Sequence, residues 1–207
     1  MGRLVDLRIL ELLAARLCHE LISPIGAIAN GVELLGEDDP DFVRDATALI
    51  EQSARKAGQR LQFYRFAYGS SATGQAAGAN PHELVGGLLD GGKLSCAWQA
   101  EALALPAEWQ KLACNMIVLA AEALPRGGTI TVAAEPPATR RVEIIGIGEA
   151  VNLTGEVRAA LARETELADL NSRTVQGYFT ASLAEALGVA VALSEPEPGQ
   201  LRLAAGP

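Results

Sequence analysis

The chain has 207 residues, of which 49% are hydrophobic and 4% aromatic, and its formal net charge at pH 7 is −8. Its length suits one large domain or two small ones, with a core filled mainly by aliphatic side chains. The acidic balance, without any clustered basic stripe, argues against a nucleic-acid-binding surface and favours a soluble protein.

The sequence predicts no membrane span. The longest apolar run, residues 112–124, is interrupted by polar residues and is too short to cross a bilayer. Residues 1–13 contain Asp6 and Glu11 and lack a cleavage site of small residues, so no signal peptide is expected. The cysteines are odd in number and lack C-x-x-C spacing, which indicates reduced thiols in a cytoplasmic protein. They are Cys18, Cys96 and Cys114.

Two long helices are predicted, over residues 3–35 and 41–68. The stretch GEDDPDF between them supplies a terminating glycine, an acidic turn and a proline for the start of the second helix. Apolar residues in the second helix recur at spacings of three, four and seven, which marks one buried stripe. Two such helices form an antiparallel hairpin that cannot bury its own apolar face well. We therefore expect a homodimer with a four-helix bundle.

The first helix has two different faces when it is projected at about 100° per residue. One face is aliphatic and is expected in the seam of the bundle: Leu17, Leu21, Ile25, Ile28, Val32 and Leu35. The opposite face is small and polar around a histidine: His19, Ser23, Gly26, Asn30 and Glu33. This strip leaves the imidazole accessible, and Pro24 is expected to bend the helix nearby.

A single helix histidine most often has no chemical role, but the small-residue strip favours one for His19. A zinc site of the H-E-x-x-H kind is excluded because the fourth following residue is Ser23. No convincing hydrolase nucleophile motif is present. Nucleophilic catalysis remains, in which a neutral imidazole nitrogen attacks a phosphoryl group and holds it as a phosphoramidate. Glu20 is a candidate to hydrogen-bond the imidazole or accept its second proton; an ordinary solvated glutamate is the alternative.

Residues 70–80, which are small, polar and glycine-rich, are predicted to link a hairpin domain, 1–69, to a C-terminal domain, 81–207. The C-terminal domain is expected to be an α+β sandwich in which one mostly antiparallel sheet is backed by helices. The predicted helices cover residues 81–89, 106–124, 154–164 and 174–187. The predicted strands lie within residues 93–100, 127–135, 140–148, 188–195 and 199–205.

Two segments resemble those of two-component sensor kinases. LCHELISPIGAI, residues 17–28, is similar to their H-box, His-Glu-Leu-x-x-Pro, which implies phosphorylation of His19 and a dimeric four-helix bundle. The C-terminal domain resembles their Bergerat-type ATP-binding domain in its element order. CNMIVLAAEALPRGGTITV is similar to the N-box of that domain. The matching residues are Asn115, Pro125, Gly127, Gly128, Ile130 and Val132.

Three departures from the kinase pattern predict that ATP is not usefully bound. The second N-box asparagine, which holds magnesium in that family, is replaced by Leu119, and an apolar side chain cannot ligate the ion. Ile144 stands where an aspartate reads adenine. The expected glycine-rich phosphate loop contains only Gly177, too few glycines for a run of free backbone N–H groups. The surviving motif residues are then expected to be a structural polar residue and two turn residues: Asn115, Gly146 and Gly148.

A phosphorylatable histidine without ATP of its own predicts a histidine phosphotransferase. The whole chain resembles the ChpT-type phosphotransferases of alphaproteobacterial phosphorelays, most closely in CHELISPIGAIANGVELL and VQGYFTASLAEALG. That resemblance implies transfer from the receiver domain of a CckA-like hybrid sensor kinase to CtrA-like and CpdR-like response regulators in cell-cycle control. No cofactor is expected, because the receiver brings its own magnesium. A pseudo-kinase adaptor that carries no phosphate and an atypical ATP-dependent histidine kinase are the alternatives.

A receiver is expected to dock on the strip beside the histidine, helped by the facing part of the second helix. The candidate docking residues are Ile22, Ser23, Gly26, Ala27, Asn30 and Gly31. Arg16, about one turn before His19, is a candidate to steady phosphate oxygens, and a solvated helix arginine is the alternative. The C-terminal domain is a candidate second contact surface, at a position that the sequence does not give.

Overall fold

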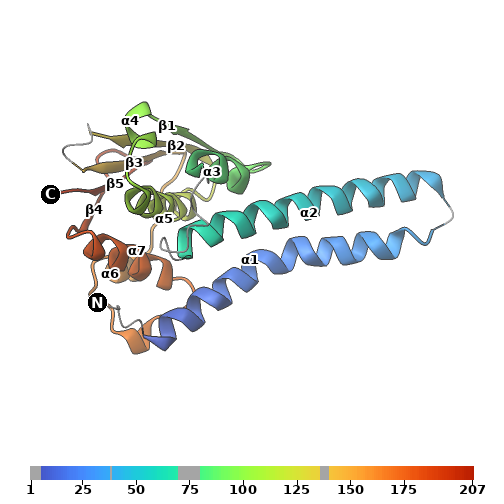
Figure 1. The fold of residues 1–207 in the computed structure, drawn as a ribbon, viewed down its shortest axis with the longest axis horizontal. Coiled ribbons are helices and arrows are strands. Elements are labelled where there is room, and N and C mark those ends of the chain that lie inside the picture. The colour runs from blue at the N-terminus through green and yellow to red at the C-terminus, as the bar shows by residue number, and fades with distance from the viewer. Residues whose placement is uncertain (1–5, 38, 70–79, 136–139) are drawn as a thin grey trace.

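The computed structural model describes residues 6–37, 39–69, 80–135 and 140–207. A long helical hairpin projects from a layered C-terminal domain, and the C-terminal end of the chain lies on the domain side of the molecule (Figure 1). The elements in chain order are α1 (Leu7–Leu34), α2 (Pro40–Tyr68), α3 (Pro81–Leu89), β1 (Leu94–Trp98), α4 (Ala100–Leu103), α5 (Ala107–Ala123), β2 (Gly128–Ala134), β3 (Val142–Ile147), α6 (Gly155–Leu161), η2 (Leu167–Asp169), α7 (Val175–Ala186), β4 (Val191–Ser194) and β5 (Gln200–Ala205).

Both hairpin helices begin at an aspartate cap. The Asp6 side chain accepts a hydrogen bond from the Arg8 backbone N–H at 2.8 Å, and Asp39 accepts one from Asp41 N–H at 2.9 Å. Pro40 occupies the first turn of α2, where its missing N–H costs nothing. The predicted antiparallel hairpin is confirmed, and α1 continues as a helix through Pro24. The part of the first predicted helix before residue 6 lies outside the described residues.

The two hairpin helices meet along a narrow seam of small side chains. Pro24, Gly31, Ala46 and Ser53 are buried there. The aliphatic face that the sequence assigns to the bundle seam is only partly covered in a single chain. Leu17, Leu21 and Ile28 are half-buried, whereas the larger apolar side chains of the hairpin that stay exposed are Leu7, Leu10, Ile22, Ile25, Val32, Leu34, Leu35, Phe42 and Leu61.

By length and composition alone, α1 could cross a membrane, since its best 18-residue window has a mean hydropathy of 1.4. A core helix of a soluble bundle passes the same criterion. Only 11% of that window is buried within the chain, so most of its residues keep contact with the surroundings of the single chain. The absence of a membrane span therefore stays a prediction.

The C-terminal domain contains one five-stranded mixed sheet with the order β1-β2-β3-β5-β4. β1 pairs in parallel with β2, and every other neighbouring pair is antiparallel. The core lies between the sheet and α5, to which Trp109, Leu112 and Ile117 contribute fully or almost fully buried side chains. The predicted helices and strands of this domain are confirmed. Sequence patterning missed α4 and η2, because single turns carry no readable periodicity.

The base of the hairpin packs into the C-terminal core through the segment FYRFAY, residues 63–68. Phe63 and Ala67 are completely buried in the main core cluster. The Tyr68 ring meets Phe179 edge-on at a centroid distance of 5.5 Å. The predicted linker, 70–80, lies outside the described residues except for Asn80, which caps α3 by accepting a hydrogen bond from His82 N–H at 3.1 Å.

Candidate functional site around His19

His19 stands on the open face of α1. Its side chain is exposed, and within the described parts of the chain it makes no hydrogen bond or ion pair. Ser23, Gly26 and Asn30 follow it as exposed residues, and Ala27 is half-buried beside them. A Cβ atom added at Gly26 would find nothing within 4 Å. The structure thus brings together most of the predicted strip as one accessible face.

Ile22 lies at the edge of this face and is 68% exposed, as the sequence projection predicts. Gly31 does not belong to the face. It is buried against α2, and a Cβ atom there would lie 2.6 Å from Ile50 Cγ1 and 3.3 Å from the Ala46 carbonyl oxygen. Its assignment as a docking residue is therefore wrong, because the missing side chain permits close packing of the two helices instead.

Glu20 points into the hairpin rather than toward the imidazole. Its Oε2 lies 3.2 Å from Nη1 of Arg60 on α2, and the same nitrogen donates a 2.7 Å hydrogen bond to the Glu20 carbonyl oxygen. Consecutive helical side chains diverge by about 100°, so the carboxylate can sit at the seam while His19 faces outward. The predicted hydrogen bond between Glu20 and His19 is replaced by a contact with Arg60, which sequence reasoning missed.

Arg16 belongs to the junction between the domains. Its guanidinium pairs with Glu122 of α5, and its Nη1 donates a 3.3 Å hydrogen bond to the Ser172 carbonyl oxygen. Only 11% of its side chain is exposed. Both predictions for this residue, contact with phosphate oxygens and a solvated side chain, are therefore corrected: Arg16 fastens α1 to the C-terminal domain one turn before the histidine.

A buried polar chain continues this junction into the second domain. Tyr68 donates its hydroxyl to Gln176 Oε1 at 2.7 Å, and Gln176 Nε2 donates to Asn115 Oδ1 at 3.0 Å. Asn115 Nδ2 in turn donates to the Ala67 carbonyl oxygen at 3.0 Å. Burial raises the pKa of Tyr68 to about 12, so its hydroxyl stays protonated and able to donate at neutral pH. The prediction that Asn115 is a structural polar residue is confirmed.

The positions that depart from the kinase pattern are packed with apolar atoms. Leu119 and Ile144 are fully buried in the main core cluster. Gly146 lies within β3, not in a turn as predicted, and a Cβ atom there would approach Leu124 Cδ1 to 3.2 Å. A Cβ atom at Gly148 would lie 2.5 Å from the Gly127 carbonyl oxygen. These glycines permit close contact between chain segments.

The segment that replaces a phosphate loop is the regular helix α7. Its single glycine, Gly177, is buried, and a Cβ atom there would lie 2.9 Å from the Val157 carbonyl oxygen of α6. The glycine therefore allows close helix packing. Within the described residues no three His, Cys, Asp or Glu side chains are grouped closely enough to hold a metal ion.

Comparisons with known proteins relate the chain to bacterial phosphotransferases. Residues 79–199 match the family model described as "Histidine phosphotransferase C-terminal domain". The chain is 34% identical to the protein phosphotransferase ChpT of Brucella abortus (strain 2308) over 185 residues, which cover 88% of each chain. It is similar to a solved bacterial phosphotransferase with a TM-score of 0.76 and 30% identity, covering 99% of this chain and 98% of that one.

Proposed function

This chain belongs to the histidine phosphotransferase family, and we propose that it relays phosphoryl groups between receiver-domain aspartates through a phosphohistidine at His19. The observation that carries this proposal is the exposed imidazole, which stands on an open strip and is not held by any group in the described chain. The buried side chains of Leu119 and Ile144 also support the proposal, because neither position offers a nucleotide a polar group or solvent-accessible space.

In the proposed reaction, a neutral imidazole nitrogen of His19 attacks the phosphorus of a receiver's aspartyl phosphate. A nitrogen–phosphorus bond forms as the phosphorus–oxygen bond breaks, and the aspartate leaves as a carboxylate. The phosphorylated ring keeps the proton on its other nitrogen until it exchanges with solvent. In the second half-reaction, another receiver's carboxylate attacks the phosphorus and the imidazole leaves. The receiver supplies the magnesium, and this chain contributes mainly positioning.

The proposed partners follow from membership of the family. A CckA-like hybrid sensor kinase would supply the phosphoryl group through its receiver domain. CtrA-like and CpdR-like response regulators would accept it in a two-component system that controls the cell cycle. We also propose that the relay takes place in the cytoplasm, which fits the three free cysteines.

A homodimer is proposed because the hairpin leaves a row of large aliphatic side chains uncovered. Ile25 is 54% exposed and Val32 is 55% exposed, on the α1 face predicted to form a bundle seam. Phe42 at the start of α2 is 57% exposed. A second hairpin packed against these side chains would remove them from water and complete a four-helix bundle. This cover also accounts for the apolar composition of α1 without a membrane.

A transfer assay separates the proposed function from its alternatives. The chain is mixed either with a receiver carrying labelled aspartyl phosphate or with labelled ATP, each in the presence of magnesium. We expect label from the receiver to appear on this chain as an acid-labile, base-stable phosphate, and no label from ATP. Stable labelling by ATP would identify an active kinase, whereas receiver binding without any label would identify an adaptor.

The docking face is tested by the variant Gly26→Trp. Because a Cβ atom at this position meets nothing within 4 Å, the indole is expected to project from the strip and obstruct a partner while leaving the hairpin intact. We expect transfer at subsaturating receiver to slow by about tenfold or more, with an unchanged thermal midpoint. Gly155→Trp, an equally open position on α6, is the matched control. Equal transfer rates in the two variants would place docking on another face.

A further inference from the structure

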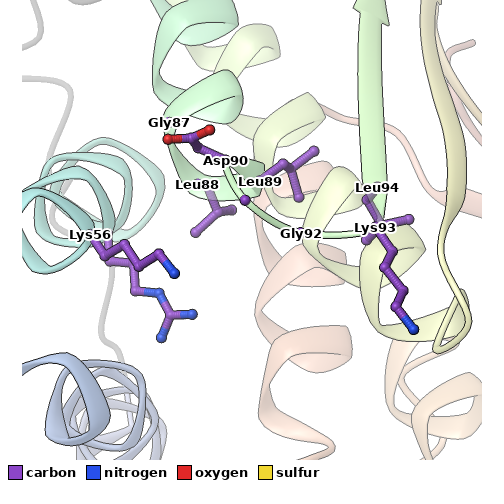
Figure 2. A pocket seen from close by; sticks show the side chains of 10 residues that line it. Lys56, Gly87, Leu88, Leu89, Asp90, Gly92, Lys93 and Leu94 are labelled. Carbon is purple, nitrogen blue, oxygen red and sulfur yellow. The ribbon is translucent and has the colours of Figure 1, made fainter. Parts of the chain in front are cut away.

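A second surface, linked through Arg60 to the residue that follows His19, is positively charged although the chain has a net charge of −8. It is a pocket of about 220 Å³ between α2 and the turn that joins α3 to β1. From α2 come Lys56 and Arg60, and residues 87–94 form the rest of the wall, that is, the end of α3, the turn that follows it and the first residue of β1. Lys56 reaches from α2 toward the turn, with Asp90 beside the turn and Lys93 at its far end (Figure 2).

The two lysines of the pocket, Lys56 and Lys93, have no counter-ion in the part of the chain that the structure describes. The only acidic residue in the lining is the exposed Asp90, so the lining contains three cations and one carboxylate. Arg60 is also shared with Glu20 at 3.2 Å. A surplus of positive charge remains on the side of the pocket open to solvent.

The wall of the turn is built to let another molecule come close. A Cβ atom added at Gly91 would lie 3.8 Å from Lys56 Cε and Nζ, which shows how near the ammonium group stands to the turn. Gly91 has a φ of +70°, a conformation that side chains rarely adopt. At this position, therefore, no side chain of the turn comes between the lysine and an approaching group.

The pocket is tied to the histidine through one guanidinium. Arg60 lines the pocket, donates to the carbonyl oxygen of Glu20 and pairs with the carboxylate of the same residue. Glu20 directly precedes the turn of α1 that carries the docking strip, and it directly follows His19. The pocket is therefore connected by one side chain to the residue that follows His19.

We propose that this pocket, formed by Lys56, Arg60, Lys93 and the α3–β1 turn, takes an acidic side chain of the docked receiver domain. The proposal rests on the proposed function, because it identifies the partner as a receiver. Magnesium in proteins is held by carboxylates, so the face that a receiver presents to His19 is acidic. A chain of net charge −8 repels such a face except where exposed cations meet it.

The test measures docking and chemistry separately for Lys56→Ala, Lys93→Ala and the double variant. Receiver affinity is measured by calorimetry with unphosphorylated receiver, and single-turnover transfer is measured at rising receiver concentration. We expect each single variant to raise the half-saturating concentration about threefold, and the double variant about tenfold, at low ionic strength. The limiting rate at saturation should stay within about twofold, because the pocket steers the partner and does not touch the phosphorus. In about 0.5 M salt the defect should shrink to less than about twofold.

Arg140→Ala is the matched control. This exposed arginine of the C-terminal domain lies just before β3, at the end of the β2–β3 pair that is opposite to Gly128. It should bind receiver as the wild type does. A double variant that binds as tightly as the wild type at low salt overturns the proposal. The proposal is also overturned if the pocket binds a small anion instead. Inorganic phosphate at constant ionic strength would then raise the thermal midpoint of the wild type but not that of Lys56→Ala, and the substitution would leave receiver affinity unchanged.

Failure of the proposed function gives a different result. The wild type would then acquire no phosphohistidine even at saturating receiver. The calorimetric comparison of wild type and double variant would still report whether the pocket contacts the receiver.

Discussion

His19→Ala is expected to lower phosphoryl transfer from a labelled receiver to background, a loss on the order of 10³-fold or more. The loss is large because the nucleophile itself is removed, and no neighbouring group can form a stable phosphoramidate in its place. Folding should be unaffected, since the exposed His19 side chain makes no contact with a partner group in the described chain. Surface substitutions of this kind change stability by only about 0.5 kcal/mol.

The matched control for this experiment is His82→Ala, because His82 is the other histidine and is exposed on the first turn of α3. The measurement is acid-labile label per protomer after a short incubation, together with the thermal midpoint of each variant. His82→Ala should be labelled as the wild type is. Residual labelling of His19→Ala at the wild-type level would assign the phosphoryl acceptor to another residue.

Leu119→Asn is expected to destabilise the protein strongly instead of restoring a nucleotide site. Leu119 is fully buried in the main core cluster, so the change removes apolar contact worth about 2 kcal/mol and buries an amide that costs roughly another 1–3 kcal/mol. Together these effects should lower the thermal midpoint by roughly 10 °C in a chain of this size.

Leu119→Met serves as the comparison, since a swap that conserves volume usually costs less than about 1.5 kcal/mol. Calorimetry with and without ATP and magnesium measures both stability and binding. The midpoint of Leu119→Asn should be the same with and without nucleotide. A folded Leu119→Asn variant whose thermal midpoint rises with ATP would mean that a nucleotide site is present and lacks only its metal ligand. The interpretation that this region is a filled apolar core would then be wrong.

The sequence predicts the architecture well where local chemistry decides it. The proline at the start of α2 and the stripes of apolar residues act over a few residues, and so the two long helices can be read directly. Alternation likewise reveals the strands around Ile130 and Ile144. The exposed position of His19 also follows, because helical projection needs only the spacing along one element.

The sequence fails where a residue's role depends on a distant partner. Glu20 and Arg60 are 40 residues apart, and Arg16 and Ser172 are 156 apart, so no local pattern pairs them. The prediction of Gly31 as an exposed docking residue is wrong for a different reason. A glycine adds no hydrophobic signal to a helical projection. The projection therefore cannot distinguish a glycine that is packed against a second helix from one on an exposed face.

The contacts at the base of the hairpin fix the spacing between His19 and the C-terminal domain. Arg8 donates to the Leu170 carbonyl oxygen at 2.8 Å, and Arg16 and Tyr68 add their contacts to the same domain. Since α1 and α2 run unbroken from this junction past the histidine, the distance between His19 and the Lys56 pocket has little freedom to vary. If receivers dock as we propose, they are selected by their dimensions as well as by their charge, because a receiver of the wrong size would reach His19 or the pocket but not both.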